Sequence, residues 1–192
     1  LGSLRDALDR VGAVDEAGQH TLLHGIVSGM AFLHSRKPEL LHRDLKSSNV
    51  LVFDGMVAKL TDFGLATQTG LSTLGTKDTA SAAGTYQYHA PELFDDEPFT
   101  PACDVFAFGV VAWEVGTGLV PWATKSQNAV SRFLMREQRP DMAQLAEGLA
   151  GKLSRRAWAR DPSVRPTFAA LLAEIDAAGI DWPPRFTGGS KL

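Results

Sequence analysis

The chain has 192 residues, of which 44% are apolar and 21% charged, a composition typical of one compact globular domain. Its formal net charge of -3 gives no support to a nucleic-acid partner, which favours a basic surface. The single cysteine, Cys103, cannot form an internal disulfide, so we expect an intracellular, cytoplasmic setting or the cytoplasmic domain of a larger protein. The longest apolar run, 105–113, is too short for a membrane segment, and no signal peptide is found.

Helices are predicted from caps and from apolar residues at helical spacing. Ser3 is a suitable N-cap for the first helix, and Thr100 with Pro101 is suited to open the central one. The central helix ends at the glycine-rich 116–118 and is apolar on all sides, so it is expected to be buried. The predicted helices span 1–10, 19–35, 101–115, 129–136, 145–158 and 166–177, and a short strand is expected at 40–41.

A β-hairpin is predicted in the first third of the chain. Two short apolar runs, 50–53 and 56–60, flank Asp54-Gly55, a dipeptide that is typical of hairpin turns. The loops 42–49 and 61–64 adjoin this hairpin on either side along the chain. Because the two strands pair, the hairpin is expected to bring these two loops together.

The loop 42–49 reads His-Arg-Asp-Leu-Lys-Ser-Ser-Asn and carries the groups that phosphoryl transfer needs. The carboxylate of Asp44 can orient and deprotonate an attacking hydroxyl, and the ammonium of Lys46 can neutralise charge on the transferred phosphate. The amide oxygen of Asn49 can bind the magnesium that screens the remaining charge. The spacing of these three residues therefore predicts a phosphoryl-transfer site.

Two further motifs, Asp62-Phe63-Gly64 and Ala90-Pro91-Glu92, follow in chain order. Together with the loop 42–49 they resemble the signatures of the protein kinase family. Lys46, two residues after the loop aspartate, is the pattern of serine/threonine kinases. The stretch 158–166, which reads Trp-x-x-Asp-Pro-x-x-Arg-Pro, resembles the tyrosine-kinase-like group of these enzymes.

The resemblance implies a mainly α fold, the large C-terminal lobe of a protein kinase, over residues 1–178. This lobe is a helical bundle around a buried central helix, with a short β-hairpin that carries the catalytic loops. Residues 179–192, rich in proline and glycine, are expected to form a disordered tail or linker. The chain contains no Gly-x-Gly-x-x-Gly loop and no phosphate-binding lysine strand, so the small N-terminal lobe is expected upstream.

The resemblance also implies ATP and Mg²⁺ as cofactors, a protein as substrate, and roles for individual residues. Two of these residues keep a second interpretation: Ser3 is equally suited to cap a helix, and Leu51 can be a core residue as well as the floor under the adenine ring. The implied roles are catalytic for Asp44, Lys46 and Thr85, nucleotide binding for Ser3, Lys46, Asn49, Leu51 and Asp62, and magnesium binding for Asn49 and Asp62.

Three more residues have counterparts in the family. The aspartate that matches Asp104 accepts hydrogen bonds from the backbone of the catalytic loop, and the arginine that matches Arg165 pairs with the counterpart of Glu92. The segment 65–84 is rich in hydroxyl side chains and matches the activation segment of kinases. Arg43 is predicted to receive a phosphate that is added within that segment.

Two functions follow from this reading. The first is a serine/threonine protein kinase domain that transfers the γ-phosphoryl of ATP to protein hydroxyls when an N-terminal lobe completes it. The alternative is a non-catalytic, truncated lobe that acts as a binding or regulatory module. The intact set of Asp44, Lys46, Asn49 and Asp62 favours the enzyme, and the isolated chain is expected to be inactive.

Overall fold

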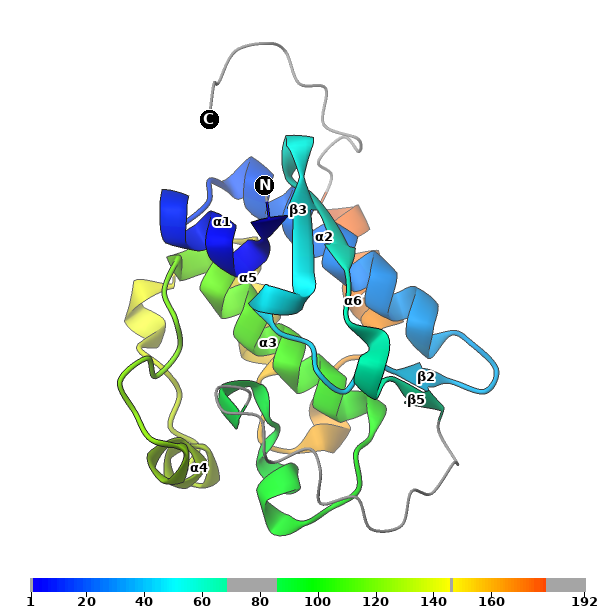
Figure 1. The fold of residues 1–192 in the computed structure, drawn as a ribbon, viewed down its shortest axis with the longest axis vertical. Helices are drawn as coiled ribbons and strands as arrows, with labels where there is room; N and C mark the ends of the chain where they lie inside the picture. The colour runs from blue at the N-terminus through cyan, green and yellow to red at the C-terminus, as the bar shows by residue number, and fades with distance from the viewer. Residues whose placement is uncertain (1, 69–85, 146, 179–192) are drawn as a thin grey trace.

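A computed structural model describes residues 2–68, 86–145 and 147–178 (Figure 1). This part of the chain is mainly helical, with a few short strands, which confirms the predicted fold class. The α-helices are α1 (Leu4–Val11), α2 (Glu16–His34), α3 (Pro101–Thr117), α4 (Gln127–Met135), α5 (Leu149–Ala157) and α6 (Phe168–Ala177). The strands are β1 (Gly2–Ser3), β2 (Leu40–Leu41), β3 (Val50–Phe53), β4 (Val57–Leu60) and β5 (Thr67–Gln68). Short 3-10 helices cover Ser47–Asn49, Asp54–Met56, Phe63–Leu65, Tyr86–Tyr88, Pro91–Asp95, Met142–Gln144 and Pro162–Val164.

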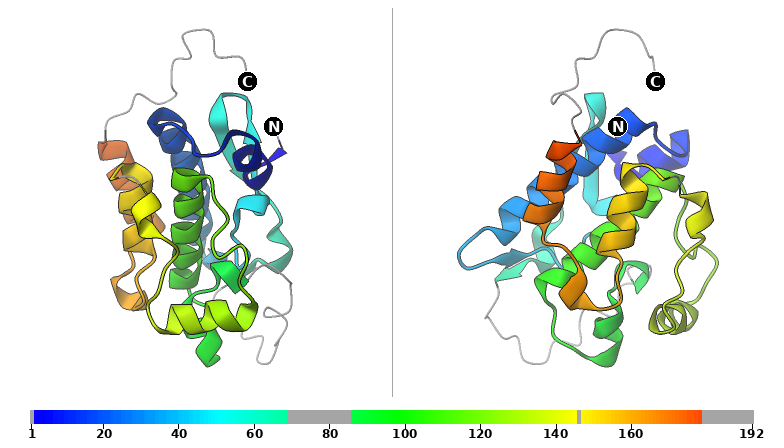
Figure 2. Two further views of the ribbon diagram at one scale, coloured as in Figure 1. Left: turned by 90° about the vertical axis from the view of Figure 1, so that its left-hand side faces the viewer. Right: turned by 180° about the vertical axis from the view of Figure 1, so that it is seen from behind.

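Helix α3 forms the buried centre of the fold, as predicted. Every residue from Cys103 to Val115 is buried. The helix begins at Pro101, after Thr100 in an extended N-cap conformation, and ends at Gly118, whose φ of 73° is left-handed. Figure 2 shows α3 between the β3–β4 hairpin on one side and α5 with α6 on the other. The apolar surface of α3 is therefore covered from both directions.

Helices α3 and α5 approach each other closely at Gly109. A Cβ atom at this position would lie 3.1 Å from the Cβ of Ala157 and 3.1 Å from the backbone nitrogen of Trp158. The hydroxyl of Ser154 donates a hydrogen bond of 2.9 Å to the carbonyl of Gly109 across the same contact. Glycine is needed here because a side chain would push the two helices apart.

Strands β3 and β4 form the predicted antiparallel hairpin, with Val50 opposite Leu60, and β1 adds to the free edge of β3. Gly55 and Met56 both have positive φ angles, of 76° and 61°. The turn therefore occupies the three residues Asp54–Met56. Strand β4 begins one residue later than predicted because Met56 belongs to the turn.

A second, two-stranded sheet joins β2 to β5, with Leu40 opposite Gln68 and Leu41 opposite Thr67. The sequence predicts β2 but not β5, because the hydroxyl-rich segment 65–84 lacks an apolar alternation. Strand β5 follows the Asp-Phe-Gly motif, and β2 directly precedes the catalytic loop. Their pairing therefore places these two segments side by side. The rest of the segment falls outside the described residues.

Five of the six predicted helices begin at other residues than predicted: α1 begins three residues late, α4 two residues early and α6 two residues late. For α2 and α5 the position of the cap gives the reason. Helix α2 begins at Glu16, three residues early, since the side chain of Asp15 accepts a hydrogen bond from the backbone nitrogen of Gly18. Helix α5 begins at Leu149, four residues late, since Gly148 is its N-cap.

The predicted ion pair between Glu92 and Arg165 is confirmed. The two guanidinium nitrogens Nη1 and Nη2 lie 2.6 Å and 2.8 Å from the two carboxylate oxygens. Arg165 also donates hydrogen bonds to the backbone carbonyls of Ala102, Ala159 and Arg160. This buried arginine therefore ties the Ala-Pro-Glu segment to the start of α3 and to the loop before α6.

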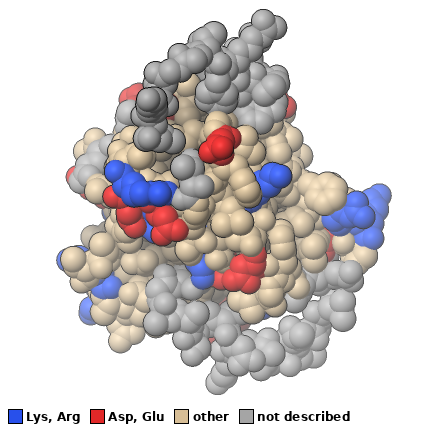
Figure 3. Space-filling view, turned by 45° about the horizontal axis from the view of Figure 1, so that its top comes forward, with Lys and Arg blue, Asp and Glu red and all other residues tan. Residues whose placement is uncertain are grey.

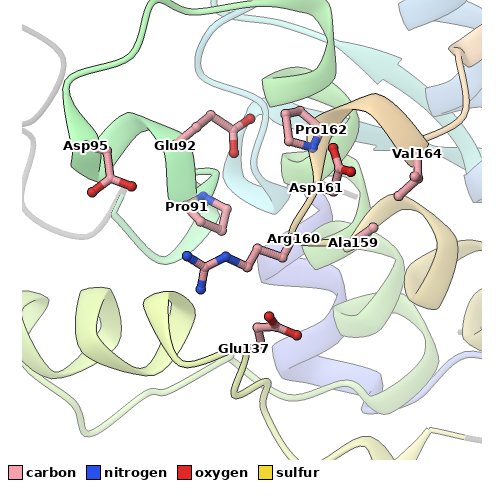
Figure 4. Close-up of a pocket in the computed structure, with 9 residues that line it drawn as sticks. All are labelled: Pro91, Glu92, Asp95, Glu137, Ala159, Arg160, Asp161, Pro162 and Val164. Carbon is pink, nitrogen blue, oxygen red and sulfur yellow. The ribbon is translucent and has the colours of Figure 1, made fainter.

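A shallow pocket adjoins this ion pair, and Figure 4 shows its lining. The Arg160 side chain lies between Pro91 and Glu137, and its Nη1 donates to the backbone carbonyl of Met135. The guanidinium of Arg160 thus lies across the pocket and is hydrogen-bonded to the protein's own backbone.

The ion pair makes a testable contribution to stability. Partial burial alone raises the pKa of the Glu92 carboxyl, but hydrogen bonds and charge from Arg165 outweigh burial and hold that pKa below its usual range. The pair therefore stabilises the fold above the unfolded pKa of 4.5, and this contribution is lost as the pH falls through the lower folded value. We expect Glu92→Gln to lower the free energy of unfolding by roughly 1–3 kcal/mol at pH 7.

The difference in unfolding free energy between the native chain and Glu92→Gln should shrink as the pH falls below 5. Urea unfolding of both proteins at several pH values will measure it. A gap that stays constant with pH would contradict this account.

Candidate active site

A buried carboxylate on α3 fixes the loop that holds the candidate catalytic residues. Oδ2 of Asp104 accepts a hydrogen bond from the backbone nitrogen of His42, and Oδ1 accepts one from that of Arg43, both at 2.9 Å. The predicted anchoring by Asp104 is thereby confirmed. Arg43 has a φ of 68°, an unfavourable left-handed conformation that these bonds hold in place.

A third group on Asp104 was missed by the sequence analysis. Nε2 of His34 lies 3.0 Å from Oδ2 of Asp104. Helical spacing places His34 in the last turn of α2 but gives no sign of a partner 70 residues away. This histidine extends the anchor to a second helix.

Asp44 is buried, with 8% of its surface exposed, and its two carboxylate oxygens have different surroundings. Oδ2 accepts hydrogen bonds from Nζ of Lys46 at 2.8 Å and from Nδ2 of Asn49 at 2.9 Å. Oδ1 has no hydrogen-bond partner among the residues that the structure describes. One oxygen is thus fixed by the loop itself, and the other is left to a further donor.

The hairpin brings the two predicted loops together. The backbone nitrogen of Thr61 donates to the carbonyl of Asn49 at 3.0 Å, and Nε2 of His42 lies 3.2 Å from the carbonyl of Thr61. The His42 ring also packs 5.3 Å from the ring of Phe63. Asp62 between them has left-handed φ and ψ angles of 60° and 66°. Asn49 and Asp62 therefore lie on adjoining, mutually bonded segments.

The two predicted magnesium residues offer suitable chemistry. Asn49 uses its amide nitrogen for Asp44, which leaves its amide oxygen for a cation. Asp62 is exposed and presents a carboxylate. Mg²⁺ prefers such hard oxygen donors and usually takes only one or two from the protein. No cluster of three or more His, Cys, Asp or Glu that could hold a metal occurs within the described ranges.

The other predicted site residues have mixed outcomes. Ser3 lies opposite Leu51 in the β1–β3 pairing. Its hydroxyl accepts from the backbone nitrogen of Asp6 at 3.1 Å and donates to the carboxylate of Asp6 at 2.7 Å, which confirms the helix cap. Leu51 is 36% exposed, whereas its neighbour Val52 is buried, so the core interpretation of Leu51 is wrong. Thr85 lies outside the described residues.

The sequence analysis also missed a buried polar cluster around Glu114, near the C-terminal end of α3. Its Oε1 accepts hydrogen bonds from Nη1 of Arg5 at 2.8 Å and from the hydroxyl of Ser47 at 3.0 Å. Its Oε2 accepts one from the hydroxyl of Tyr88 at 3.0 Å. The only hint in the sequence is a charged residue within an apolar run. One carboxylate thus joins α1, the catalytic loop and the Tyr86–Tyr88 turn to α3.

Comparison with known proteins identifies the family. The family model described as "Protein tyrosine and serine/threonine kinase" matches residues 1–175. The chain belongs to the protein kinase family. It is 34% identical to the serine/threonine-protein kinase CTR1 of Arabidopsis thaliana over 183 residues, which are 89% of the chain and 21% of CTR1. It is 39% identical to the human receptor-interacting serine/threonine-protein kinase 3 over 166 residues, which are 81% of the chain and 32% of that kinase.

These matches agree with the predicted resemblance to serine/threonine kinases of the tyrosine-kinase-like group. The chain spans between a fifth and a third of the length of these two kinases. Within the described residues, no helix is both long enough and apolar enough to cross a membrane. Figure 3 shows acidic and basic side chains interspersed on one face of the molecule, with wide uncharged areas between them.

The Asp104 anchor predicts a local effect of its removal. Asp104→Ala leaves two buried backbone donors without acceptors, which should cost roughly 1–3 kcal/mol. Faster hydrogen exchange at the amides of His42 and Arg43, relative to the native chain, is the measurement that checks it. Asp54→Ala, on the hairpin turn, is the control and should leave both amides unchanged. Unchanged exchange in Asp104→Ala would refute the anchor.

The Glu114 cluster predicts the opposite pH trend to Glu92. Burial raises the pKa of Glu114 to about 7, although Arg5, Ser47 and Tyr88 favour its ionised form. Because the folded pKa exceeds the unfolded value of 4.5, stability from this group falls as the pH rises between these two values.

Relative to Glu114→Gln, the native chain should therefore lose roughly 2–3 kcal/mol of unfolding free energy between pH 5 and pH 8. Chemical unfolding of both proteins across this range is the check. A difference that does not change with pH would show that Glu114 does not titrate there.

Proposed function

We propose that this chain is the large lobe of a serine/threonine protein kinase that transfers the γ-phosphoryl of ATP to a serine or threonine hydroxyl of a protein. The observation that carries the proposal is the asymmetry of Asp44. Lys46 and Asn49 hold one oxygen, while the other has no partner in the described part of the chain. A general base needs this combination of a fixed orientation and a free lone pair.

In the proposed reaction, Oδ1 of Asp44 accepts the hydrogen of the substrate hydroxyl and orients its oxygen toward the phosphorus. As the new P–O bond forms, the bond between the γ-phosphorus and the β–γ bridging oxygen breaks, ADP leaves, and the proton of the hydroxyl passes to this carboxylate. The ammonium of Lys46, 2.8 Å from Oδ2, is placed beside the reacting groups and offsets the negative charge of the transferred phosphoryl. We assign Thr85, which lies outside the described residues, to bracing Asp44 and Lys46.

Asn49 and Asp62 are the residues that would hold Mg²⁺, and the ion would supply charge neutralisation at the phosphates. Leu51 offers an exposed apolar surface for the adenine ring, with Ser3 beside it for the ribose. The sequence contains no Gly-rich phosphate loop and no phosphate-binding lysine strand. We therefore propose that a small kinase lobe supplies the opposite wall of the nucleotide site.

Arg43 is the proposed receptor for an activating phosphate. Its Nε is buried and has no hydrogen-bond partner among the described residues, and its Cζ lies 5.6 Å from the ring centre of Phe99. A guanidinium with unused donors suits a phosphate, which binds arginine in bidentate fashion.

The test is Asp44→Asn in a polypeptide that joins this chain to a kinase small lobe. The substitution is nearly isosteric but removes the base, so phosphate transfer to a serine/threonine substrate should fall by roughly 10²–10⁴. Asp95→Asn, at an exposed aspartate outside the site, is the control and should keep the parent rate. A rate for Asp44→Asn within threefold of the parent, with an unchanged melting temperature, would reject the assignment. Absence of transfer in the parent would favour the non-catalytic lobe.

A further inference from the structure

A closed ring of three polar side chains adjoins the catalytic loop and takes no part in the proposed chemistry. The hydroxyl of Ser47 donates to Oε1 of Glu114 at 3.0 Å, and the hydroxyl of Tyr88 donates to Oε2 of the same carboxylate at 3.0 Å. The oxygens of the two hydroxyls lie 3.2 Å apart, which closes the ring. All three side chains are buried, so the ring is shielded from bulk water.

The ring holds the catalytic loop at the turn that carries two partners of Asp44. Ser47 directly follows Lys46 and opens the 3-10 helix Ser47–Asn49, in which the backbone nitrogen of Asn49 donates to the carbonyl of Lys46 at 2.9 Å. Lys46 and Asn49 are also the residues that bind Oδ2 of Asp44. A fixed Ser47 hydroxyl therefore sets the turn between these two partners, and with it the orientation of the Asp44 carboxylate.

The number of protons in the ring distinguishes two ways of replacing Glu114. When Glu114 is ionised, both hydroxyl protons point at its carboxylate, and the contact between Ser47 and Tyr88 holds no proton. A glutamine in this position has one acceptor and one donor group, so all three contacts can be hydrogen bonds. Its amide nitrogen would donate to Tyr88, the Tyr88 hydroxyl to Ser47, and the Ser47 hydroxyl to the amide oxygen. Glutamine thus preserves the ring, whereas alanine removes it.

Arg5, the cation that faces Glu114 from α1, has other acceptors as well. It pairs with Asp9 at 2.9 Å and donates to the backbone carbonyls of Gly118 and Leu119 at 2.9 Å and 3.3 Å. These acceptors remain when Glu114 is replaced by glutamine, so the loss of one charge is not expected to release α1. The two replacements of Glu114 therefore differ chiefly in the ring.

We propose that Glu114 is a positioning residue for phosphoryl transfer and acts through Ser47. The ring fixes the Ser47 hydroxyl, and this fixes the turn that carries the two partners of Asp44. The role rests on the proposed function, because it concerns the rate of that reaction. The intact ring, rather than the negative charge of Glu114, is what the reaction requires.

Steady-state kinetics test this role in the polypeptide that joins this chain to a kinase small lobe, with a serine-containing peptide and Mg²⁺-ATP. Glu114→Ala should lower kcat roughly 10- to 100-fold, because small displacements of reacting groups have effects of this size. Both KM values should stay within threefold, since no contact with either substrate is removed. Glu114→Gln should keep kcat within threefold of the parent. Glu147→Ala, at a side chain that is 87% exposed, is the matched control and should keep the parent rate.

Ser47→Ala is the second variant, and it separates the loop from the ring while Glu114 keeps Arg5 and Tyr88. It removes a single oxygen atom, so the fold should survive even where that of Glu114→Ala does not. The loss of one hydrogen bond should lower kcat roughly 3- to 10-fold with unchanged KM values. All rates are compared at a temperature at which thermal melts show each protein to be folded, because a purely structural role would change the melts and leave kcat alone.

Hydrogen exchange in the 192-residue chain tests the positioning without any activity. The backbone nitrogens of Asn49 and Val50 donate hydrogen bonds within the turn, so both amides should exchange faster in Ser47→Ala than in the native chain. Glu114→Gln should leave them unchanged. The amide of His42, which Asp104 holds, is the internal control and should not change in either variant.

A positioning role is ruled out if Ser47→Ala keeps kcat within twofold of an active parent, or if exchange at Asn49 and Val50 does not change. It is also ruled out if Glu114→Gln loses as much kcat as Glu114→Ala, since the charge and not the ring would then be required. An inactive parent would reject the proposed function, and the role in phosphoryl transfer would fall with it. The exchange rates would still decide whether the ring holds the turn.

Discussion

The hydrogen bonds between one buried carboxylate and two successive backbone amides hold this site together. A short loop that contains a left-handed arginine would not keep one conformation by itself. The Asp104 carboxylate accepts hydrogen bonds from the backbone nitrogens of His42 and Arg43. Helix α3 therefore sets the direction of the backbone that leads to Asp44. Helix α3 is buried along most of its length, so the packing of the core fixes the position of α3. Through Asp104, this also fixes the position of the Asp44 carboxylate.

The same helix holds the loop a second time, by a different kind of contact. Glu114 binds the hydroxyl of Ser47, which follows Lys46 directly, so the loop is held at its beginning and near its end. Asp104 is matched by backbone donors and a histidine, whereas burial of Glu114 raises its pKa to about 7 despite three hydrogen-bonding partners. Burying the Glu114 carboxylate costs desolvation free energy, and its hydrogen bonds favour one arrangement of α1, the catalytic loop and α3.

Much of this architecture could be predicted from local patterns. Caps and helical spacing identified α1 and α3, and the Asp54-Gly55 turn identified the hairpin, because these signals arise between residues close in sequence. The resemblance to kinases supplied the distant contacts of Asp104 and Arg165, since such pairs have no local signature.

The features that were missed all depend on where separate elements meet. Strand β5 forms only because β2 is there to pair with it, and its own composition is that of a loop. His34 and Glu114 have partners far away in the sequence, and helical spacing shows only that each lies on a helix. Their roles follow from packing, which a single sequence does not display.

The spacing of the two carboxylates on α3 has a consequence for how this region can diverge among related chains. Asp104 and Glu114 are ten residues apart on one uninterrupted helix, a separation of about 15 Å along its axis. Inserting or deleting one residue between them would rotate one carboxylate about 100° around the axis and turn it away from its partners. Exchanges among apolar residues of similar volume would leave both carboxylates in place. Selection should therefore constrain the number of residues between Asp104 and Glu114 more strictly than the identity of most residues between them.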